Sequence, residues 1–168
     1  MKILVSDTSV LIDLERGSFL DSCFKLPFEF VVPDLLYKRE LAGFGGPKLV
    51  KLGLRVEELG GDEVTIAQTV RTACPRRGQR IGEGIGQGKL GVRTLLTGDG
   101  ELRALAKAGK VPFFGVLWVL DQLFEGAVME AAAIASGLEA IAAHPRCRLP
   151  SAEIQARLER FRSGKALA

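Results

Sequence analysis

Two stretches decide the fold: Ile3-Leu4-Val5-Ser6-Asp7 and Thr94-Leu95-Leu96-Thr97-Gly98-Asp99 are short, largely apolar runs that each end in an aspartate. A buried strand of a parallel sheet has such an unbroken apolar run, and open α/β sheets keep their sites at the carboxyl ends of the strands. Two such strands side by side would bring Asp7 and Asp99 together. Because like charges held close repel each other unless a cation lies between them, the pair predicts a site for Mg²⁺ or Mn²⁺, which prefer oxygen ligands.

The composition fits a single domain with a sizeable core. The chain has 168 residues and 47% hydrophobic content, and a chain of this length buries roughly two-thirds of its surface on folding. No apolar run approaches the ~20 residues of a membrane span, so we expect no membrane segment. Three cysteines without metal-like spacing favour reduced thiols and a cytoplasmic protein. The formal charge of +3 permits a polyanionic partner without requiring one.

Strand-like and helix-like segments alternate along the chain. The expected strands are Ile3–Ser6, Phe28–Val32, Leu54–Leu59, Thr94–Thr97 and Val111–Val116. The expected helices are Val10–Arg16, Asp34–Leu41, Lys48–Leu52, Asp62–Thr72, Glu101–Lys107, Val119–Phe124, Val128–Ala143 and Ser151–Arg162. This alternation predicts an α/β fold of three layers, α/β/α, with a central parallel sheet of four to five strands. We expect one domain over residues 1–126 and a C-terminal helical extension over residues 127–168 that packs on it.

Four motifs follow the expected strands in a fixed order. They are Asp7-Thr8-Ser9-Val10-Leu11-Ile12, then Val32-Pro33-Asp34-Leu35-Leu36 with Glu40, then Leu95-Leu96-Thr97-Gly98-Asp99 with Leu102-Arg103, and finally Gly115-Val116-Leu117-Trp118. In this order and spacing they resemble the PIN domain family of metal-dependent ribonucleases, which includes the VapC-type toxins of bacterial toxin–antitoxin pairs. The resemblance covers residues 1–126. It implies a hydrolase that cleaves RNA with Mg²⁺ or Mn²⁺, forms a homodimer and is held inactive by an antitoxin protein.

The resemblance also implies an acidic centre made of Asp7, Glu40 and Asp99, which would act as metal ligands and catalytic residues. A phosphodiester hydrolase must place a water in line with phosphorus and offset charge on the leaving oxygen, and a bound metal does both. Thr97 would orient a metal-bound water or a phosphate oxygen. Ser9 lies where the first helix begins, and free N–H groups at that end of a helix favour a phosphate. The competing interpretation makes each aspartate a helix cap and Glu40 a solvated charge.

One part of the family pattern is atypical in this chain. The family carries its third acid on an Ala/Leu-rich helix about 18 positions before the equivalent of Asp99, where this chain has Ile81. Residues 76–91 contain six glycines and no alanine, which disfavours a helix because each glycine costs about 1 kcal/mol relative to alanine. Glu83 is the only acid in the stretch, and it would take the ligand position if two residues are deleted here.

Several interpretations of this glycine-rich segment stay open. Its basic residues, which are Arg76, Arg77, Arg80, Lys89 and Arg93, can contact an RNA backbone, or the segment is a solvated loop. A third interpretation is that a change in the coding sequence, such as a shifted reading frame, has replaced the helix that the family usually has here. Residues 86–91 match G-x-G-x-x-G but lack the strand before and the helix after, so we expect no dinucleotide cofactor. The alternative to an active ribonuclease is therefore a catalytically impaired PIN-like module that binds RNA or a protein partner.

Overall fold

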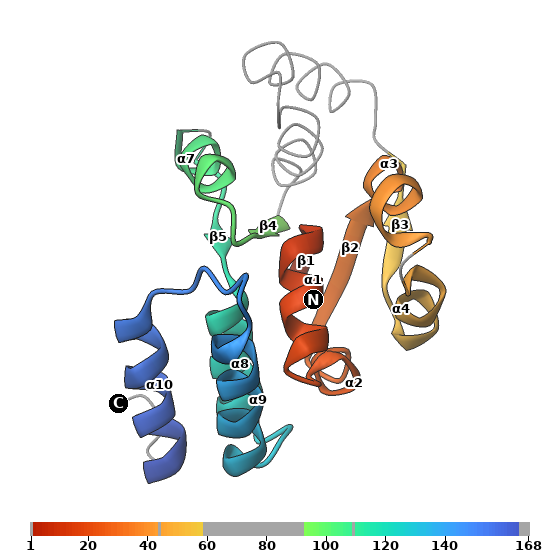
Figure 1. The fold of residues 1–168 in the computed structure, drawn as a ribbon. Coiled ribbons are helices and arrows are strands. Elements are labelled where there is room, and N and C mark those ends of the chain that lie inside the picture. Colours follow the sequence, from red (N-terminus) through yellow and green to blue (C-terminus); the bar gives the residue numbers. More distant parts are fainter. Residues whose placement is uncertain (1, 44, 59–92, 109, 165–168) are drawn as a thin grey trace.

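The computed structural model describes residues 2–43, 45–58, 93–108 and 110–164, and the structural statements below concern these residues (Figure 1). The expected helix Asp62–Thr72 and the candidate residue Glu83 lie outside them. None of the helices in these ranges combines the length and the apolar character that a membrane span requires.

A single sheet of five parallel strands forms the centre of the protein. The strands are β1 (Lys2–Ser6), β2 (Phe28–Pro33), β3 (Arg55–Glu57), β4 (Arg93–Leu96) and β5 (Phe113–Phe114), and they lie in the order β3-β2-β1-β4-β5. The central strand β1 places Leu4 opposite Phe30 of β2 and opposite Thr94 of β4. Leu4 and Val5 are fully buried, as expected for a strand that is covered on both faces.

The helices follow the strands as the alternating pattern predicts. They are α1 (Thr8–Arg16), α2 (Leu20–Cys23), α3 (Asp34–Leu36), the π-helical turn η1 (Tyr37–Leu41), α4 (Gly46–Leu52), α7 (Gly100–Ala108), α8 (Val116–Glu125), α9 (Ala131–Ala143) and α10 (Ser151–Ser163). The connection from β1 to β2 and the connection from β4 to β5 run in opposite directions along the sheet. Since such crossovers are almost always right-handed, α1 and α7 belong to opposite faces. The expected three-layer α/β/α fold is therefore confirmed.

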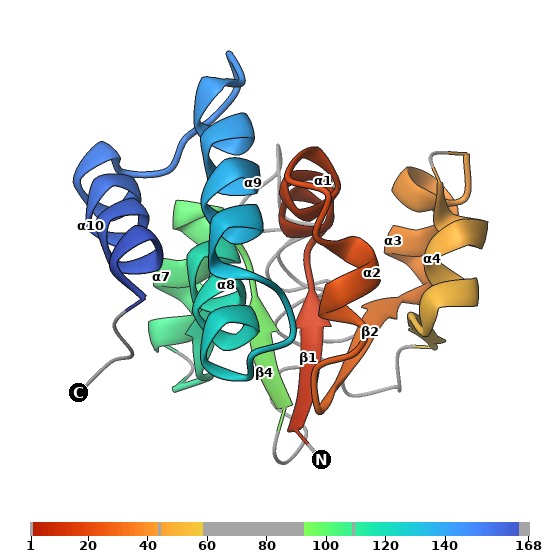
Figure 2. The same cartoon turned by 90° about the horizontal axis from the view of Figure 1, so that it is seen from below.

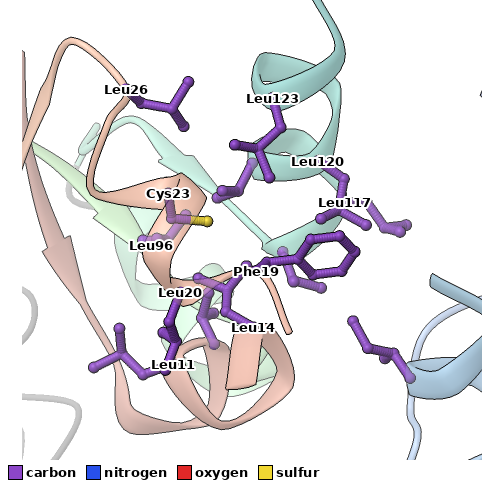
Figure 3. Packing of buried hydrophobic residues seen from close by; sticks show 14 of the residues in the cluster. Leu11, Leu14, Phe19, Leu20, Cys23, Leu26, Leu96, Leu117, Leu120 and Leu123 are labelled. Carbon is purple, nitrogen blue, oxygen red and sulfur yellow. The ribbon is translucent and has the colours of Figure 1, made fainter. Parts of the chain in front are cut away.

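The core lies between the sheet and the helices of the α1 side. Helices α1, α2, α8 and α9 pack against one another there, and α10 packs on α9 at the outside (Figure 2). Figure 3 shows side chains from α1, α2, β4 and α8 meeting in one cluster. Its labelled members are Leu11, Leu14, Phe19, Leu20, Cys23, Leu26, Leu96, Leu117, Leu120 and Leu123.

Helix α10 is held by both apolar and charged contacts. Ile154, Leu158 and Phe161 are buried in the common core. The charged contacts join α10 to α8, where Asp121 accepts hydrogen bonds from Arg157 at 3.0 Å and from Arg160 at 2.9 Å. Burial raises the pKa of Asp121 and the two arginines oppose that rise. The division of the chain at residue 126 stays a prediction.

One expected strand is shorter in the structure, and one short helix was not predicted. The expected strand Val111–Val116 is reduced to the two residues of β5, and Val116 instead begins α8. Gly115 takes an extended conformation at the N-cap of that helix, so the strand ends before it. Helix α2 was not expected, because four residues are too few to show a hydrophobic period.

Candidate active site

Asp7 lies at the carboxyl end of β1, at the point where the strand order of the sheet reverses. Its backbone N–H donates to the carbonyl of Leu96 in the neighbouring strand at 2.9 Å, which holds the end of β1 against the end of β4. Asp7 is also the N-cap residue of α1, but its carboxylate makes no capping bond. Only 7% of the residue is exposed. Instead, Oδ2 accepts a hydrogen bond from the Ser9 hydroxyl at 2.8 Å.

Thr97 connects the two aspartates that the sequence pattern singles out. Its fully buried hydroxyl donates to Oδ2 of Asp7 at 3.1 Å and accepts from the backbone N–H of Asp99 at 3.1 Å. A hydroxyl has one proton to donate and two lone pairs, so it can serve both partners at once. The carboxyl ends of β1 and β4 are thereby joined through one side chain.

Asp99 serves as the N-terminal cap of α7. Its Oδ1 accepts from the backbone N–H groups of Glu101 at 2.9 Å and Leu102 at 3.1 Å. A carboxylate in this position satisfies donors that the helix itself leaves unpaired, and it lies at the positive end of the helix dipole. The helix-cap interpretation thus describes part of what Asp99 does, whereas the Asp7 carboxylate is engaged by hydroxyl groups.

Arg103 belongs to the Asp99 motif of the sequence, which predicted no role for it, and the structure shows what it binds. Its Nε and Nη2 both donate to the carbonyl oxygen of Thr97, at 3.1 and 3.0 Å. Gly115 leaves the space for this guanidinium, because a Cβ on Gly115 would collide with Nη2. Its spacing from Asp99, one helical turn, is visible in the sequence and places it near the same strand end. Its partner is a backbone carbonyl, however, and a pattern of residue types cannot reveal such a partner.

Glu40, the other acidic residue expected in the site, comes from a separate element. It lies in the turn η1, where the N–H of Ala42 donates to the carbonyl of Tyr37 at 2.8 Å, five positions back. Single π-helical turns of this kind are frequent at functional sites. Glu40 is half-buried and, together with Thr8, lines a cavity between α1 and η1. Glu40 and the residue that follows Asp7 thus line the same cavity.

The donor atoms of this region fit a hard divalent cation in their chemistry. The carboxylates of Asp7 and Asp99 and the hydroxyls of Ser9 and Thr97 are all oxygen donors, which Mg²⁺ and Mn²⁺ prefer. Mg²⁺ keeps several waters and takes only one or two protein carboxylates directly. Within the ranges that the structure describes, no three His, Cys, Asp or Glu side chains form a group that could hold a metal ion. The metal-ligand set Asp7, Asp99 and Glu40 therefore stays a prediction.

Comparison with known families agrees with this architecture. The family model described as a PIN domain matches residues 3–163, which is nearly the whole chain and includes α9 and α10. The chain belongs to the PIN domain family, as the order of its motifs indicates. A search of curated proteins finds no match. PIN domains are generally nucleases and typically use divalent metals, so a nuclease-type fold is established here at the level of the family.

Proposed function

We propose that this protein is an endoribonuclease that hydrolyses RNA phosphodiester bonds and depends on Mg²⁺ or Mn²⁺. The observation that carries the proposal is the chain of hydrogen bonds from Ser9 through Asp7 and Thr97 to Asp99. It joins the Asp7 carboxylate to the backbone of Asp99, and both residues follow the carboxyl ends of adjacent parallel strands, which is where open α/β sheets bind ligands. A purely structural aspartate at the start of α1 would have capped the helix, and Asp7 does not.

In this proposal each candidate residue has a role. Asp7 and Asp99 would hold the metal ion, with Glu40 and Glu83 completing the acidic centre. The chemistry that such an ion supplies is an activated water and compensation of negative charge on the phosphate. Ser9 and Thr97 hold the Asp7 carboxylate in one orientation through their hydroxyl protons. The N-terminal N–H groups of α1 favour a phosphate beside this carboxylate.

Cleavage of a mixed RNA substrate tests the proposal directly. The wild-type protein should cleave in Mg²⁺ or Mn²⁺ and stop in EDTA, and Asp7→Asn should lose most of the activity. Asn keeps a side-chain oxygen that Ser9 and Thr97 can still bond, so this variant should fold. Asp21→Asn, which changes an exposed carboxylate on α2, is the matched control and should cleave like the wild type. Absence of cleavage with either metal, or equal cleavage by Asp7→Asn, would leave a PIN-like module that binds RNA or protein without catalysis.

We further infer a role as the toxin of a toxin–antitoxin pair in the cytoplasm, acting as a homodimer and restrained by an antitoxin protein. Family membership is what supports this finer proposal. Production of the protein alone in a bacterial host should arrest growth, and Asp7→Asn should relieve the arrest while being produced at the same level. Growth that is unaffected by an RNA-cleaving wild-type protein would contradict the toxin role and leave the nuclease proposal standing.

A further inference from the structure

A cavity of about 250 Å³ lies beside the candidate active site, among α1, α2, η1 and α4. Its apolar lining consists of Leu11, Ile12, Leu20, Leu41 and Leu49, and Glu15, Glu40 and Lys48 add charged groups. Sites for drug-sized ligands usually occupy roughly 300–1,000 Å³. The volume therefore suits one planar ring system rather than a longer ligand.

Thr8, a residue of the cavity wall, carries a buried hydroxyl that has no partner among the described residues. The residue is 4% exposed, lines the cavity, and its hydroxyl has no hydrogen-bond partner within the described part of the chain. Buried hydroxyls are almost always bonded, because leaving one unpaired costs free energy. A ligand in the cavity would remove that cost once the Thr8 side chain rotates its hydroxyl toward it.

The cavity extends along one face of α1, away from the aspartates. Thr8, Leu11, Ile12 and Glu15 have the i, i+3, i+4, i+7 spacing of residues on one helix face. Thr8 lies at the inner end, between Asp7 and Ser9 in the chain, and Glu15 is exposed at the other end. Whatever occupies the cavity can therefore be covalently continuous with a group held at the Asp7 end.

We propose that the cavity binds one unpaired RNA base that carries an exocyclic amino group, next to the phosphate that is cleaved. The inference rests on the proposed function and specifies its substrate. Apolar walls accommodate the faces of a base, and proteins that read single-stranded RNA bind such splayed-out bases by their edges. Carboxylates accept hydrogen bonds from amino groups such as N4 of cytosine, and Glu15 is a carboxylate on the lining.

The same groups discriminate against the other occupants. Uracil has a carbonyl oxygen in place of the cytosine amino group, so it would face Glu15 with an acceptor. An apolar side chain from a partner protein would fill the volume but leave the hydroxyl of Thr8 without a bond. A base with an amino group satisfies the walls, the hydroxyl and the carboxylate together.

Nucleoside binding to the full-length protein tests the inference without metal and without cleavage. Cytidine and uridine are titrated separately in EDTA, and backbone amide signals are followed by ¹H–¹⁵N NMR. Cytidine should shift the signals of Thr8, Ile12 and Leu49 and bind about tenfold more tightly than uridine, the discrimination expected of a good base-edge contact. Glu15→Gln should reduce this preference. Thr8→Val should weaken cytidine binding by about fivefold, the usual effect of one neutral hydrogen bond.

Two control variants separate the site from nonspecific effects. Glu159→Gln changes an exposed carboxylate on α10 and should leave both affinities unchanged. Ile12→Trp fills the cavity from its wall and should abolish the cytidine-induced shifts. Equal affinity for cytidine and uridine, or shifts that survive Ile12→Trp, would overturn the inference. Absence of shifts with either nucleoside would also overturn it and favour a protein side chain as the occupant. Because cleavage is not the readout, these results are distinct from a failure of the ribonuclease proposal.

Discussion

At the scale of single residues, Thr97 is the side chain on which the geometry of both strand-end aspartates depends. Thr97→Val keeps the shape but removes the donor to Asp7 and the acceptor for the N–H of Asp99. Leaving buried polar groups unpaired costs about 1–3 kcal/mol, so we expect urea unfolding to show a loss of that size. RNA cleavage should fall as well, because the Asp7 carboxylate loses one of the hydroxyls that orient it.

The same substitution at Thr94 provides the control for Thr97→Val. Thr94 is also buried on β4, but it is not part of the hydrogen-bond chain between the aspartates. Thr94→Val should therefore affect cleavage less than Thr97→Val does. Equal cleavage by wild type and Thr97→Val would show that the chain of hydrogen bonds has no role in activity.

Cys23 illustrates how burial alone sets the reactivity of a side chain. It is 1% exposed in the core, and burial raises the pKa of its thiol to about 12. Since only the thiolate reacts with alkylating agents, Cys23 should resist iodoacetamide at pH 8. Cys147 is half-buried and should be modified before Cys23. Peptide mass spectrometry of native and urea-unfolded protein measures this, and equal rates at Cys23 in the two states would contradict the expected burial.

The unfolded thiol ionises from about pH 9.0, whereas the folded one keeps its proton up to about pH 12. The folded state therefore binds more protons in this interval, and the contribution of Cys23 to stability is complete below pH 9.0 and is lost as the pH rises toward 12.

At the scale of elements, α9 approaches the end of α1 closely because Gly137 of α9 lies against Gly17, the C-cap residue of α1. A Cβ at Gly137 would lie 2.5 Å from the backbone oxygen of Gly17 and would also collide with the ring of Phe19. Alanine in a helix is favoured over glycine by about 1 kcal/mol, but overpacking against backbone costs roughly 1–3 kcal/mol. The free-energy cost of the clash should exceed the gain in helix propensity, so Gly137→Ala should lower the thermal midpoint of unfolding. As a control, Ser136→Ala on the exposed side of α9 should leave the thermal midpoint unchanged or raise it slightly. If Gly137→Ala raised the thermal midpoint, the two helices would be able to separate at no cost in stability.

Elements that depend on local periodicity could be predicted from the sequence, and those that depend on tertiary contacts could not. The apolar runs of β1 and β4 and the helix following each were recognisable because burial on both faces leaves a continuous apolar pattern. The turn η1 was not, since its fit depends on Gly46, where a Cβ would lie 2.5 Å from the carbonyl oxygen of Leu41. The role of Asp7 depends likewise on Thr97, which lies 90 positions away in the chain. Capping preferences relate an aspartate only to the helix that follows it, so they could not predict this distant partner.

At the scale of the whole molecule, the two halves of the chain meet where β1 pairs with β4. Asp7 comes from the first half and Asp99 from the second, and both lie at the ends of these paired strands. A ligand that binds both carboxylates would therefore hold the halves together. Such a ligand stabilises the native state by mass action, since the unfolded chain does not present the two groups side by side.

Thermal unfolding with and without divalent metal tests this coupling. At a metal concentration 100 times the dissociation constant, binding adds about 2.7 kcal/mol, which corresponds to a rise of about 5–10 °C in the midpoint for a chain of this length. We expect that rise in millimolar Mn²⁺ or Mg²⁺ relative to EDTA. Asp21→Asn should respond like the wild type, because its carboxylate lies on α2.

Asp99→Asn separates the metal response from the structural role of the same side chain. Asn is as good a helix N-cap as Asp, so the bonds to the N–H groups of Glu101 and Leu102 can persist and α7 should remain capped. The substitution removes one negative charge from the region of Asp7, so the midpoint in EDTA should be unchanged or higher. The rise with metal should largely disappear, because Asn is a neutral and weaker ligand. A wild-type midpoint that ignores both metals would contradict a shared acidic site. If Asp99→Asn retains the full response, the ion binds through other residues.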